Sequence, residues 1–191
     1  MGAGVWTQAL KRAARLLCGD YTAYYIYRRA AVEASDRPDP DVLPIDSEGL
    51  AALVDPHLAE HAAYAGVDSM AFCLSVAGTP AAVCFFWAGE RYRRHSQAFW
   101  PLAPAQANLM QIVTSPRARG QGAATRLIAE SARRMSAAGW QVLYARVWHS
   151  HVASWMAFER AGWRRVALVL EINPWRRKSP WRLRFALGLD R

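Results

Sequence analysis

Two arginines and two glycines stand close together in the segment Arg117-Ala-Arg-Gly-Gln-Gly122, between an apolar run and a helical pattern. Glycine lets a ligand approach the backbone closely, and the first turn of a helix presents unpaired N–H groups with partial positive charge. Arg117 and Arg119 add full positive charge. These residue types in this order predict an anion site that suits phosphate. The pattern also fits an ordinary strand-to-helix turn with solvated arginines, because a glycine loop alone is a weak signal.

The elements on either side of this segment can be predicted from their patterns. Residues 109–114 form an apolar run with a β-branched end, which favours a buried strand that Ser115-Pro116 interrupts. After the glycines, apolar residues recur at helical spacing over residues 124–138. Gly139 then predicts the end of the helix. The unit is therefore a strand, a basic glycine loop and a helix.

Two stretches of this region resemble the signature motifs of the GNAT superfamily of acyl-CoA-dependent N-acyltransferases. Arg119-Gly-Gln-Gly-Ala-Ala124 matches the family's arginine/glutamine-x-x-glycine-x-glycine/alanine loop. Ser154 to Trp163 resembles its second signature, a helix that ends in glycine and an aromatic residue. The resemblance covers about Met70 to Trp163. The length of 191 residues suits one domain, residues 1–191. The resemblance implies that its fold belongs to the α/β (α+β) class, as a three-layer αβα sandwich with a mixed, mostly antiparallel sheet.

The resemblance also implies a site for acetyl-CoA or another acyl-CoA, with no metal. Two strands would splay apart, and the backbone at the end of one would hydrogen-bond the pantetheine arm while the loop amides hold the pyrophosphate. An acceptor amine would attack the thioester carbonyl directly within a ternary complex. The residues expected at the cofactor are Ile112, Val113, Thr114, Arg117, Arg119, Gly120, Gln121, Gly122, Ala123, Ala124, Thr125, His151 and Phe158.

The acid–base residues are less clearly marked. In the family's second motif a tyrosine four residues before the glycine often protonates the leaving thiolate, and here that position is Phe158. His151 aligns with an asparagine that is often found at the start of this helix, and it is the candidate catalytic residue, as proton donor to the thiolate. It fits a capping or packing role equally well, and His149 is the alternative donor. A base acting through water is expected from Glu90 or from residues 46–65.

The remaining elements follow from periodicity and turn residues. We expect strands at 21–27, 69–77, 81–88, 141–148 and 164–172, short helices at 46–54 and 56–65, and a helix from about Ser150 to Gly162 that Ser150 caps. Asp46 and Asp55 are predicted as N-caps of the two short helices. Residues 33–44 are expected to form a loop and residues 90–96 a polar turn. The aromatic loop 99–104 is predicted to be a wall of the acceptor pocket or a stiff surface connection.

Several residue types in the chain argue against other chemistries. His57 and His61 share a helical face, but no third ligand is evident, so surface histidines are favoured over a metal site. Cys73 and Cys84 lie in apolar runs and are predicted to be buried, reduced thiols. No stretch approaches the roughly 20 apolar residues of a membrane span. The N-terminal segment is not a signal peptide, because basic residues interrupt its apolar positions.

The basic residues are concentrated at the two ends of the chain. The net charge of +9 divides into +4 for residues 1–29, −1 for residues 30–163 and +6 for residues 164–191. Residues 5–17 form a basic amphipathic helical pattern, and residues 174–191 read as a last strand or a basic aromatic tail. An anionic membrane surface or an acidic acyl-carrier protein would suit these ends as partner. The alternative is that both ends pack on the sheet with solvated arginines.

Two hypotheses about function therefore stand. The first is a cytoplasmic N-acyltransferase that acts on a small-molecule amine acceptor, with peripheral attachment to a membrane left open. The second is a non-catalytic module that binds acyl-CoA or a membrane on a degenerate form of the same fold, which Phe158 favours. Nucleic-acid binding is weaker than both, because the chain has basic ends but no recognised reading motif. The sequence predicts no oligomeric state.

Overall fold

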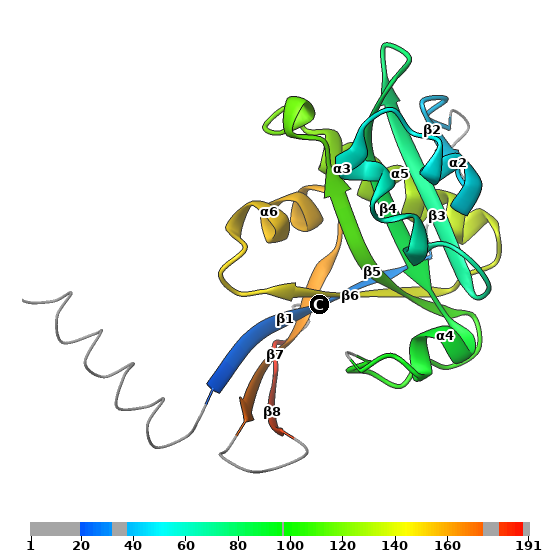
Figure 1. Cartoon of the computed structure of the whole chain (residues 1–191). Coiled ribbons are helices and arrows are strands. Elements are labelled where there is room, and N and C mark those ends of the chain that lie inside the picture. Colours follow the sequence, from blue (N-terminus) through cyan, green and yellow to red (C-terminus); the bar gives the residue numbers. More distant parts are fainter. Residues whose placement is uncertain (1–19, 32–37, 97, 174–179, 189–191) are drawn as a thin grey trace, which may run out of the picture.

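The computed structural model describes residues 20–31, 38–96, 98–173 and 180–188 (Figure 1). In this part of the chain, strands form one sheet in the order β2-β3-β4-β5-β6-β1-β7-β8. Neighbouring strands are antiparallel except β5 and β6, which are parallel, so the predicted mixed and mostly antiparallel sheet is confirmed. The strands are β1 (Asp20–Ala30), β2 (Val42–Pro44), β3 (Ser69–Val76), β4 (Thr79–Trp87), β5 (Gln106–Thr114), β6 (Val142–Trp148), β7 (Arg164–Asn173) and β8 (Trp181–Ala186).

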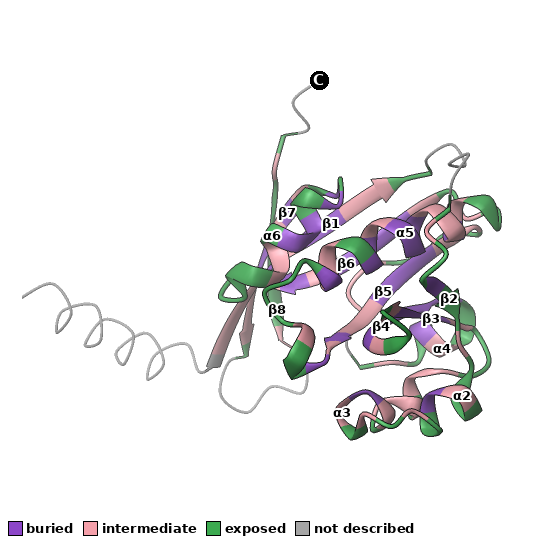
Figure 2. Ribbon diagram, turned by 90° about the horizontal axis from the view of Figure 1, so that it is seen from above, coloured by how far each residue is buried: buried purple, intermediate pink, exposed green. Residues whose placement is uncertain are grey.

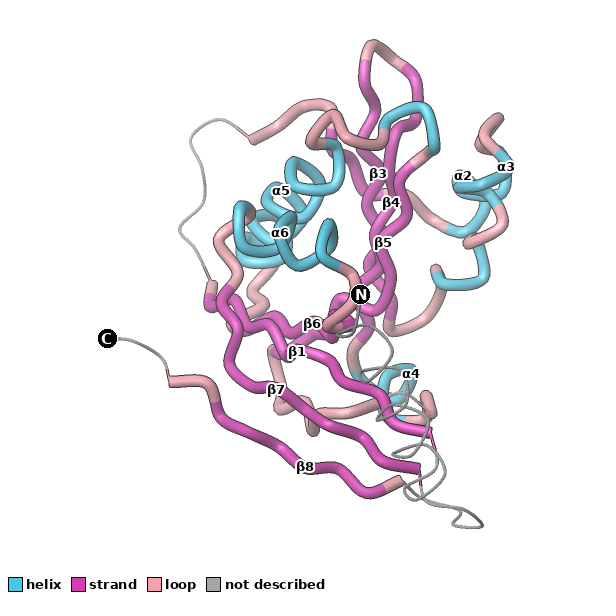
Figure 3. The backbone as a smooth tube through the Cα atoms, turned by 90° about the vertical axis from the view of Figure 1, so that its left-hand side faces the viewer, coloured by secondary structure: helices cyan, strands magenta, loops and turns pink. Residues whose placement is uncertain are grey.

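Helices cover both faces of the sheet, which gives three layers (Figure 3). The helices α5 (Ala123–Ala137) and α6 (Val152–Arg160) lie on one face, where Leu127, Ile128 and Phe158 are buried against the strands. On the other face lie α2 (Ser47–Ala51), α3 (Pro56–Ala59) and α4 (Gly89–Arg93), which bury Leu50, Leu58 and Tyr92. The buried residues therefore lie along the central strands and the inner sides of these helices (Figure 2).

The predicted helix boundaries are confirmed where a specific residue fixes them. The Asp46 carboxylate accepts a hydrogen bond from the Gly49 amide at 2.8 Å, and the Asp55 carboxylate accepts one from the His57 amide at 3.0 Å. Both bonds satisfy amides of a first helical turn that have no partner within the helix. Gly139 follows α5 with a φ of 92°, a backbone conformation that ends a helix and that glycine adopts without a steric penalty.

The structure differs from the sequence-based expectation at several element boundaries. The end of the predicted loop 33–44 pairs with β3 as the short edge strand β2, and residues 90–96 contain the helix α4 rather than only a turn. The predicted helix 56–65 ends at Ala59 and is followed by a separate 3₁₀ turn at Ala62–Tyr64. The strand predicted from residue 109 begins at Gln106. These short elements are specified by their tertiary partners, which a local pattern does not contain.

The cap of α6 also differs from the prediction. The residue before its first turn is His151 rather than Ser150, and no side chain of either residue caps the helix. The last-strand alternative for the C-terminal segment is confirmed, because β8 pairs with β7 from Trp181 to Ala186. The remaining predictions for residues 5–17 and 174–179 fall outside the described residues. Within the described ranges, no helix is long and apolar enough to cross a membrane.

The two described cysteines are buried, free thiols, as the sequence predicts. Cys84 lies on β4 beneath α5, and burial raises the pKa of its thiol to about 12. Cys73 lies on β3 and packs on the opposite face, and burial raises the pKa of its thiol as well. Both side chains therefore act as small apolar groups of the core and carry no thiolate chemistry at neutral pH.

Candidate active site

The strands β5 and β6 separate halfway along β5. They pair only where Gln106–Leu109 lies beside Val142–Ala145. Beyond Leu109, β5 continues to Thr114 beside β4, whereas β6 continues beside β1. The edge of residues 110–114 that faces β6 has no strand partner among the described residues. The predicted splay is therefore present, and the free edge includes Ile112, Val113 and Thr114, whose backbone groups can pair with an extended ligand.

A β-bulge lies at the point where the two strands separate. On the β4 side, Phe85 pairs with Gln111 and Phe86 pairs with Leu109, so Met110 is an extra residue with no partner on β4. A bulge interrupts the ladder and re-aims the backbone groups beside it. Among the described residues, Met110 therefore has a register partner on neither β4 nor β6.

The glycine loop after β5 leads directly into α5. Gly120 and Gly122 have φ values of +74° and +79°, in the left-handed region that favours glycine. A Cβ atom built on either residue meets no protein atom within 4 Å, so the space in front of the loop is open. Gly122 is the N-cap of α5, and no side chain caps the first-turn amides of Ala123, Ala124 and Thr125. Open space before uncapped amides is the geometry of an anion site.

Side chains tie this loop to the end of β5. The Arg119 guanidinium donates to the Thr114 carbonyl at 3.4 Å, and its other end lies 3.3 Å from Nε2 of His57. The Gln121 side chain donates to the Arg117 carbonyl at 2.8 Å. The loop is therefore held in one conformation by its own polar side chains, and the two arginines keep positive charge at its surface.

Two adjoining cavities lie along the splayed strands. The first, which we call the loop cavity, has a volume of about 470 Å³ and is lined by the glycine loop, the first turn of α5 and one side of α6. The second, the strand cavity, has a volume of about 270 Å³ and lies between the separating strands. Ile112, Ser154 and Phe158 line both, so the two cavities meet at these side chains.

Most of the predicted cofactor residues meet in these cavities. Residues Ile112, Thr114, Arg119, Gly120, Gly122, Ala123, Ala124, Thr125 and Phe158 line the loop cavity, and His151 lines the strand cavity. Arg117 and Gln121 instead line a separate hollow of about 710 Å³ on the side of the β3–β4 hairpin, which also reaches Gly122 and Ala123. The Val113 side chain packs into the core against α2 and α3, so only its backbone faces the splay.

His151 is the histidine that the structure places at the strand cavity. It precedes α6, its side chain is exposed, and its carbonyl accepts hydrogen bonds from the amides of Ser154 and Trp155. His149 lines neither cavity. Its Nδ1 atom instead lies 3.0 Å from the Ala23 carbonyl on β1. The geometry therefore favours His151 over His149 as a group that can reach a ligand.

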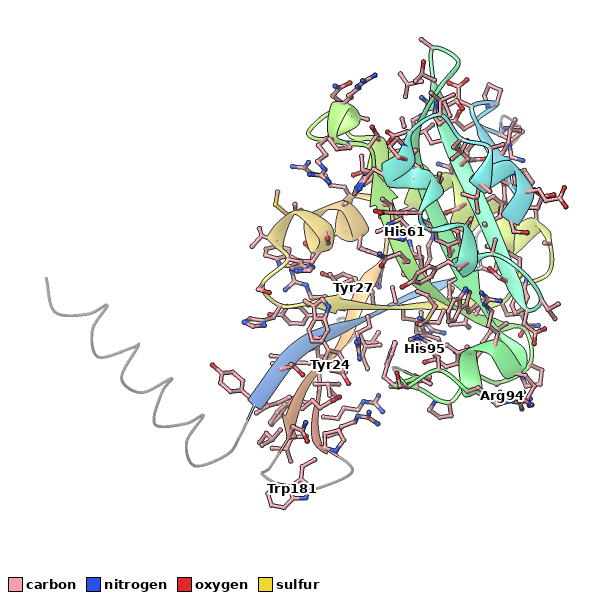
Figure 4. The ribbon with its side chains drawn as sticks, in the orientation of Figure 1. Tyr24, Tyr27, His61, Arg94, His95 and Trp181 are labelled. Carbon is pink, nitrogen blue, oxygen red and sulfur yellow. The ribbon has the colours of Figure 1, made fainter. Side chains whose placement is uncertain are left out.

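Phe158 forms the wall between the cavities and the core. Its ring packs against Tyr27 with the centroids 5.4 Å apart, and against Trp163 at 5.2 Å. The Tyr27 hydroxyl accepts from Arg165 at 2.8 Å and lies outside both cavities, and burial raises the pKa of this phenol (Figure 4). Tyr27 therefore supports Phe158 from behind and does not supply the phenol that Phe158 lacks.

No carboxylate from the described residues lines either cavity. Glu90, a predicted base, pairs with Arg93 and Arg94 on α4. Within residues 46–65, His57 and His61 each lie near Glu60, at 3.4 and 3.6 Å, and Asp55 caps α3. The described ranges contain no group of three or more side chains suited to a metal ion.

Sequence reasoning did not predict several residues of the strand cavity, among them Arg146, Trp148 and Ser154. Alternation along β6 places Arg146 and Trp148 on the same face as Tyr144, which was a usable signal. What the sequence lacked was the pairing that brings β6 beside β5, since residues 106–109 and 142–145 are far apart in the chain. The loop 99–104, predicted as a wall of the acceptor pocket or a stiff surface connection, contributes Phe99 to this cavity.

The sheet splays beside a glycine loop and a helix start. This is the arrangement that the resemblance to GNAT acyltransferases implies. A model of the acetyltransferase (GNAT) family matches residues 20–163, and the chain belongs to this family. No curated protein matches the sequence.

Two solved structures illustrate the similar fold. One is the GNAT-family acetyltransferase of Colwellia psychrerythraea, with 16% identity, a TM-score of 0.57 and coverage of 91% of this chain and 63% of that one. The other is the GCN5-related N-acetyltransferase of Sphaerobacter thermophilus, with 11% identity, a TM-score of 0.52 and coverage of 96% of this chain and 58% of that one. This chain thus spans less than two thirds of each, and at these identities the likeness concerns the fold alone.

Proposed function

We propose that the chain is an N-acyltransferase that moves an acyl group from acyl-CoA to an amine. The observation that carries this proposal is the pair of adjoining cavities, one at an open, uncapped helix start and the other at the point where β5 and β6 separate. The loop end suits a pyrophosphate, and the free edge of β5 suits an amide-containing arm that pairs as a strand would.

The residues present fit an acyl-CoA in three respects. Gly120 and Gly122 leave open space in front of the backbone, the first-turn amides of Ala123 and Ala124 are uncapped beside it, and Arg119 adds positive charge there. When bound, an acyl-CoA supplies a thioester carbonyl that an amine can attack. The chain's own task is to hold the two reactants in line and to handle charge and protons.

The bulge and His151 supply the polar groups for that task. The backbone amides around Met110 stabilise negative charge on the carbonyl oxygen, because the bulge frees them from the β4 ladder at the point of separation. The amine nitrogen forms a bond to the carbonyl carbon, the carbon–sulfur bond breaks, and His151 gives a proton to the departing sulfur. The proton lost by the amine passes to solvent, since no described carboxylate lines the cavity.

The proposal is tested by mixing the purified chain with acetyl-CoA, a longer acyl-CoA and a panel of amines, and measuring the thiol released together with the mass of the product. We expect thiol release that depends on the amine and yields one acylated amine per thiol. Binding of CoA in calorimetry without release for any amine would instead favour a non-catalytic acyl-CoA-binding module. Absence of both binding and release would refute the proposed function.

We expect His151→Ala to lower kcat by roughly tenfold or more, because general acids contribute on the order of 10²-fold to a step and a thiolate needs less help than an alkoxide. The affinity for CoA should change little, since His151 lies at the strand cavity rather than at the loop. His149→Ala is the matched control, because its ring contacts the Ala23 carbonyl outside both cavities. Equal kcat for both variants would show that His151 does not donate the proton.

A further inference from the structure

Arg146 is an arginine of the strand cavity whose guanidinium is stacked but has no hydrogen-bond or charge partner among the described residues. Its Cζ atom lies 4.9 Å from the ring centre of Tyr24 and 4.7 Å from that of Trp148. Phe99 packs edge-on against Tyr24 at 6.1 Å, next to the same cavity. Aromatic stacking engages the face of a guanidinium and leaves its N–H donors along the edge. The aromatic rings thus hold Arg146 in place with donors to spare.

Asn108 presents a second unused polar group to the same cavity. The residue is 1% exposed, its side-chain nitrogen lies 2.9 Å from the Met110 sulfur, and its side-chain oxygen has no partner in the described structure. A thioether is a weak acceptor, so either orientation of the amide leaves one polar atom for a ligand. A buried polar atom without a partner costs free energy, which a bound ligand would recover.

Arg146 and Asn108 lie on the same side of the sheet. Asn108 is in register with Tyr144, and alternation along β6 places Tyr144 and Arg146 on one face. This is the face covered by α2, α3 and α4, whereas His151, Ser154 and Phe158 reach the strand cavity from α6 on the opposite face. The strand cavity therefore has two ends, with α6 at one end and the unpartnered groups of Arg146 and Asn108 at the other.

The charge at this second end is positive. No Asp or Glu of the described residues lines the strand cavity, and the acid on the neighbouring part of this face, Glu171, already pairs with Arg182 at 3.0 Å. The Tyr24 hydroxyl donates to the same Glu171 oxygen, Oε2, at 3.4 Å. Arg146 would repel a polycationic acceptor, because no described carboxylate lines the strand cavity to offset the charge.

We infer that the acceptor is an amine that carries an anionic oxygen group, of the amino-acid type. Arg146 binds the carboxylate through its free N–H edge, and Asn108 accepts a hydrogen bond from the amine, which lies between Arg146 and the thioester. The inference rests on the proposed function, because it names the substrate class of the same site. A guanidinium matches a planar carboxylate with two parallel hydrogen bonds, which is the geometry that discriminates an acid from its amide.

The test compares three pairs of acceptors with acetyl-CoA: glycine and glycinamide, L-phenylalanine and L-phenylalaninamide, and phosphoethanolamine and ethanolamine. We expect kcat/KM to be at least tenfold higher for the acidic member of a pair. The α-amine of an amino-acid amide is less basic than that of the free amino acid, so a larger fraction of it is unprotonated and nucleophilic at neutral pH. A preference for the free amino acid is therefore a stringent result. The third pair distinguishes a phosphate from a carboxylate as the recognised anion, and preference for phosphoethanolamine alone would overturn the amino-acid assignment.

The decisive variant is Arg146→Met, which keeps an apolar stem between the rings and removes the charge. It should lower the ratio of kcat/KM for the acid to kcat/KM for the amide at least tenfold, through a higher KM for the acid. The affinity for CoA should be unchanged. Arg146→Lys should retain part of the preference. If neutral amines release thiol and acids are not preferred, the inference is wrong while the acyltransferase function stands. The same holds if Arg146→Met leaves the ratio of kcat/KM for acid and amide unchanged.

A second measurement does not depend on turnover. Calorimetric titration of the three acids at saturating CoA should show binding to the wild-type chain and about tenfold weaker binding to Arg146→Met. If CoA binds but none of the acids does, the inference is wrong whatever the rate assays give. If CoA itself fails to bind, the proposed function fails first, so the two failures are distinguishable.

Discussion

Replacement of Gly122 with valine is expected to lower the affinity for CoA by roughly 100-fold or more. Gly122 has a φ of +79° and is the N-cap of α5, and its missing Cβ faces open space in front of the first-turn amides. A valine there fills the space where a pyrophosphate would contact the backbone. Loss of one or two charge-assisted hydrogen bonds, at about 1.5–3 kcal/mol each, gives this magnitude. Calorimetric titration with CoA measures it directly.

The strain of a side chain at positive φ must be separated from the loss of binding space. Gly78 offers the matched control, because it has a φ of +75°, its Cβ would also meet nothing within 4 Å, and it lies in the β3–β4 turn outside both cavities. Gly78→Val should cost similar stability in thermal unfolding, since both substitutions place a branched residue in the left-handed region. CoA affinity that falls equally in both variants would mean that the glycine loop does not hold the pyrophosphate.

Arg119→Ala in the same loop should weaken CoA binding less than Gly122→Val. The Arg119 guanidinium is exposed and also contacts the Thr114 carbonyl and His57, so solvent screens its charge and part of its role is to hold the loop. The backbone amides are fixed by the helix and can donate to a bound pyrophosphate without the ordering of a long side chain. The ranking of the two variants therefore tells whether the amides or the arginine dominate anion binding.

The parts of the fold that the sequence predicted are those where a local pattern has one physical meaning. The glycines at 120 and 122, the caps Asp46 and Asp55 and the helix end at Gly139 were all identified because backbone geometry demands those residue types. The helix α4 and the strand β2 were missed because each is only a few residues long and is specified by its contacts with neighbouring elements. Local propensity says little at such lengths.

The active site divides in the same way. The part of the loop cavity formed by the glycine loop and the first turn of α5 could be predicted, because its residues are nearly consecutive in the chain and carry a motif. On the α6 side only Phe158 was predicted. The strand cavity could be predicted only in part, since Asn108 and Arg146 meet through the parallel pairing of β5 with β6. Asn108 was noticeable as a polar residue in an apolar run, but Arg146 had no signal beyond its place on an alternating strand. Acceptor specificity thus depends on residues that only the sheet topology brings together.

Ser154→Trp is expected to reduce turnover of acyl-CoA by roughly 100-fold or more. Ser154 is half-buried on α6 and lines both cavities, at the place where they meet beside Ile112 and Phe158. An indole in this position would fill the passage that the pantetheine arm needs in order to reach the strand cavity. A displaced thioester loses the alignment with the bulge that direct attack requires, and misplacement by about 1 Å alone can cost on the order of 10²-fold.

The loop end of the site should remain intact in Ser154→Trp, which makes the effect diagnostic. Adenosine 3′,5′-bisphosphate, a fragment that lacks the arm, should bind the variant as it binds the wild-type chain, because the glycine loop and the first turn of α5 are unchanged. Val152→Trp is the control, since Val152 is 50% exposed on the same helix and lines neither cavity. If Ser154→Trp retains full turnover, the pantetheine arm does not pass between Ile112, Ser154 and Phe158. The proposed path of the arm from the glycine loop to the splayed strands would then be wrong.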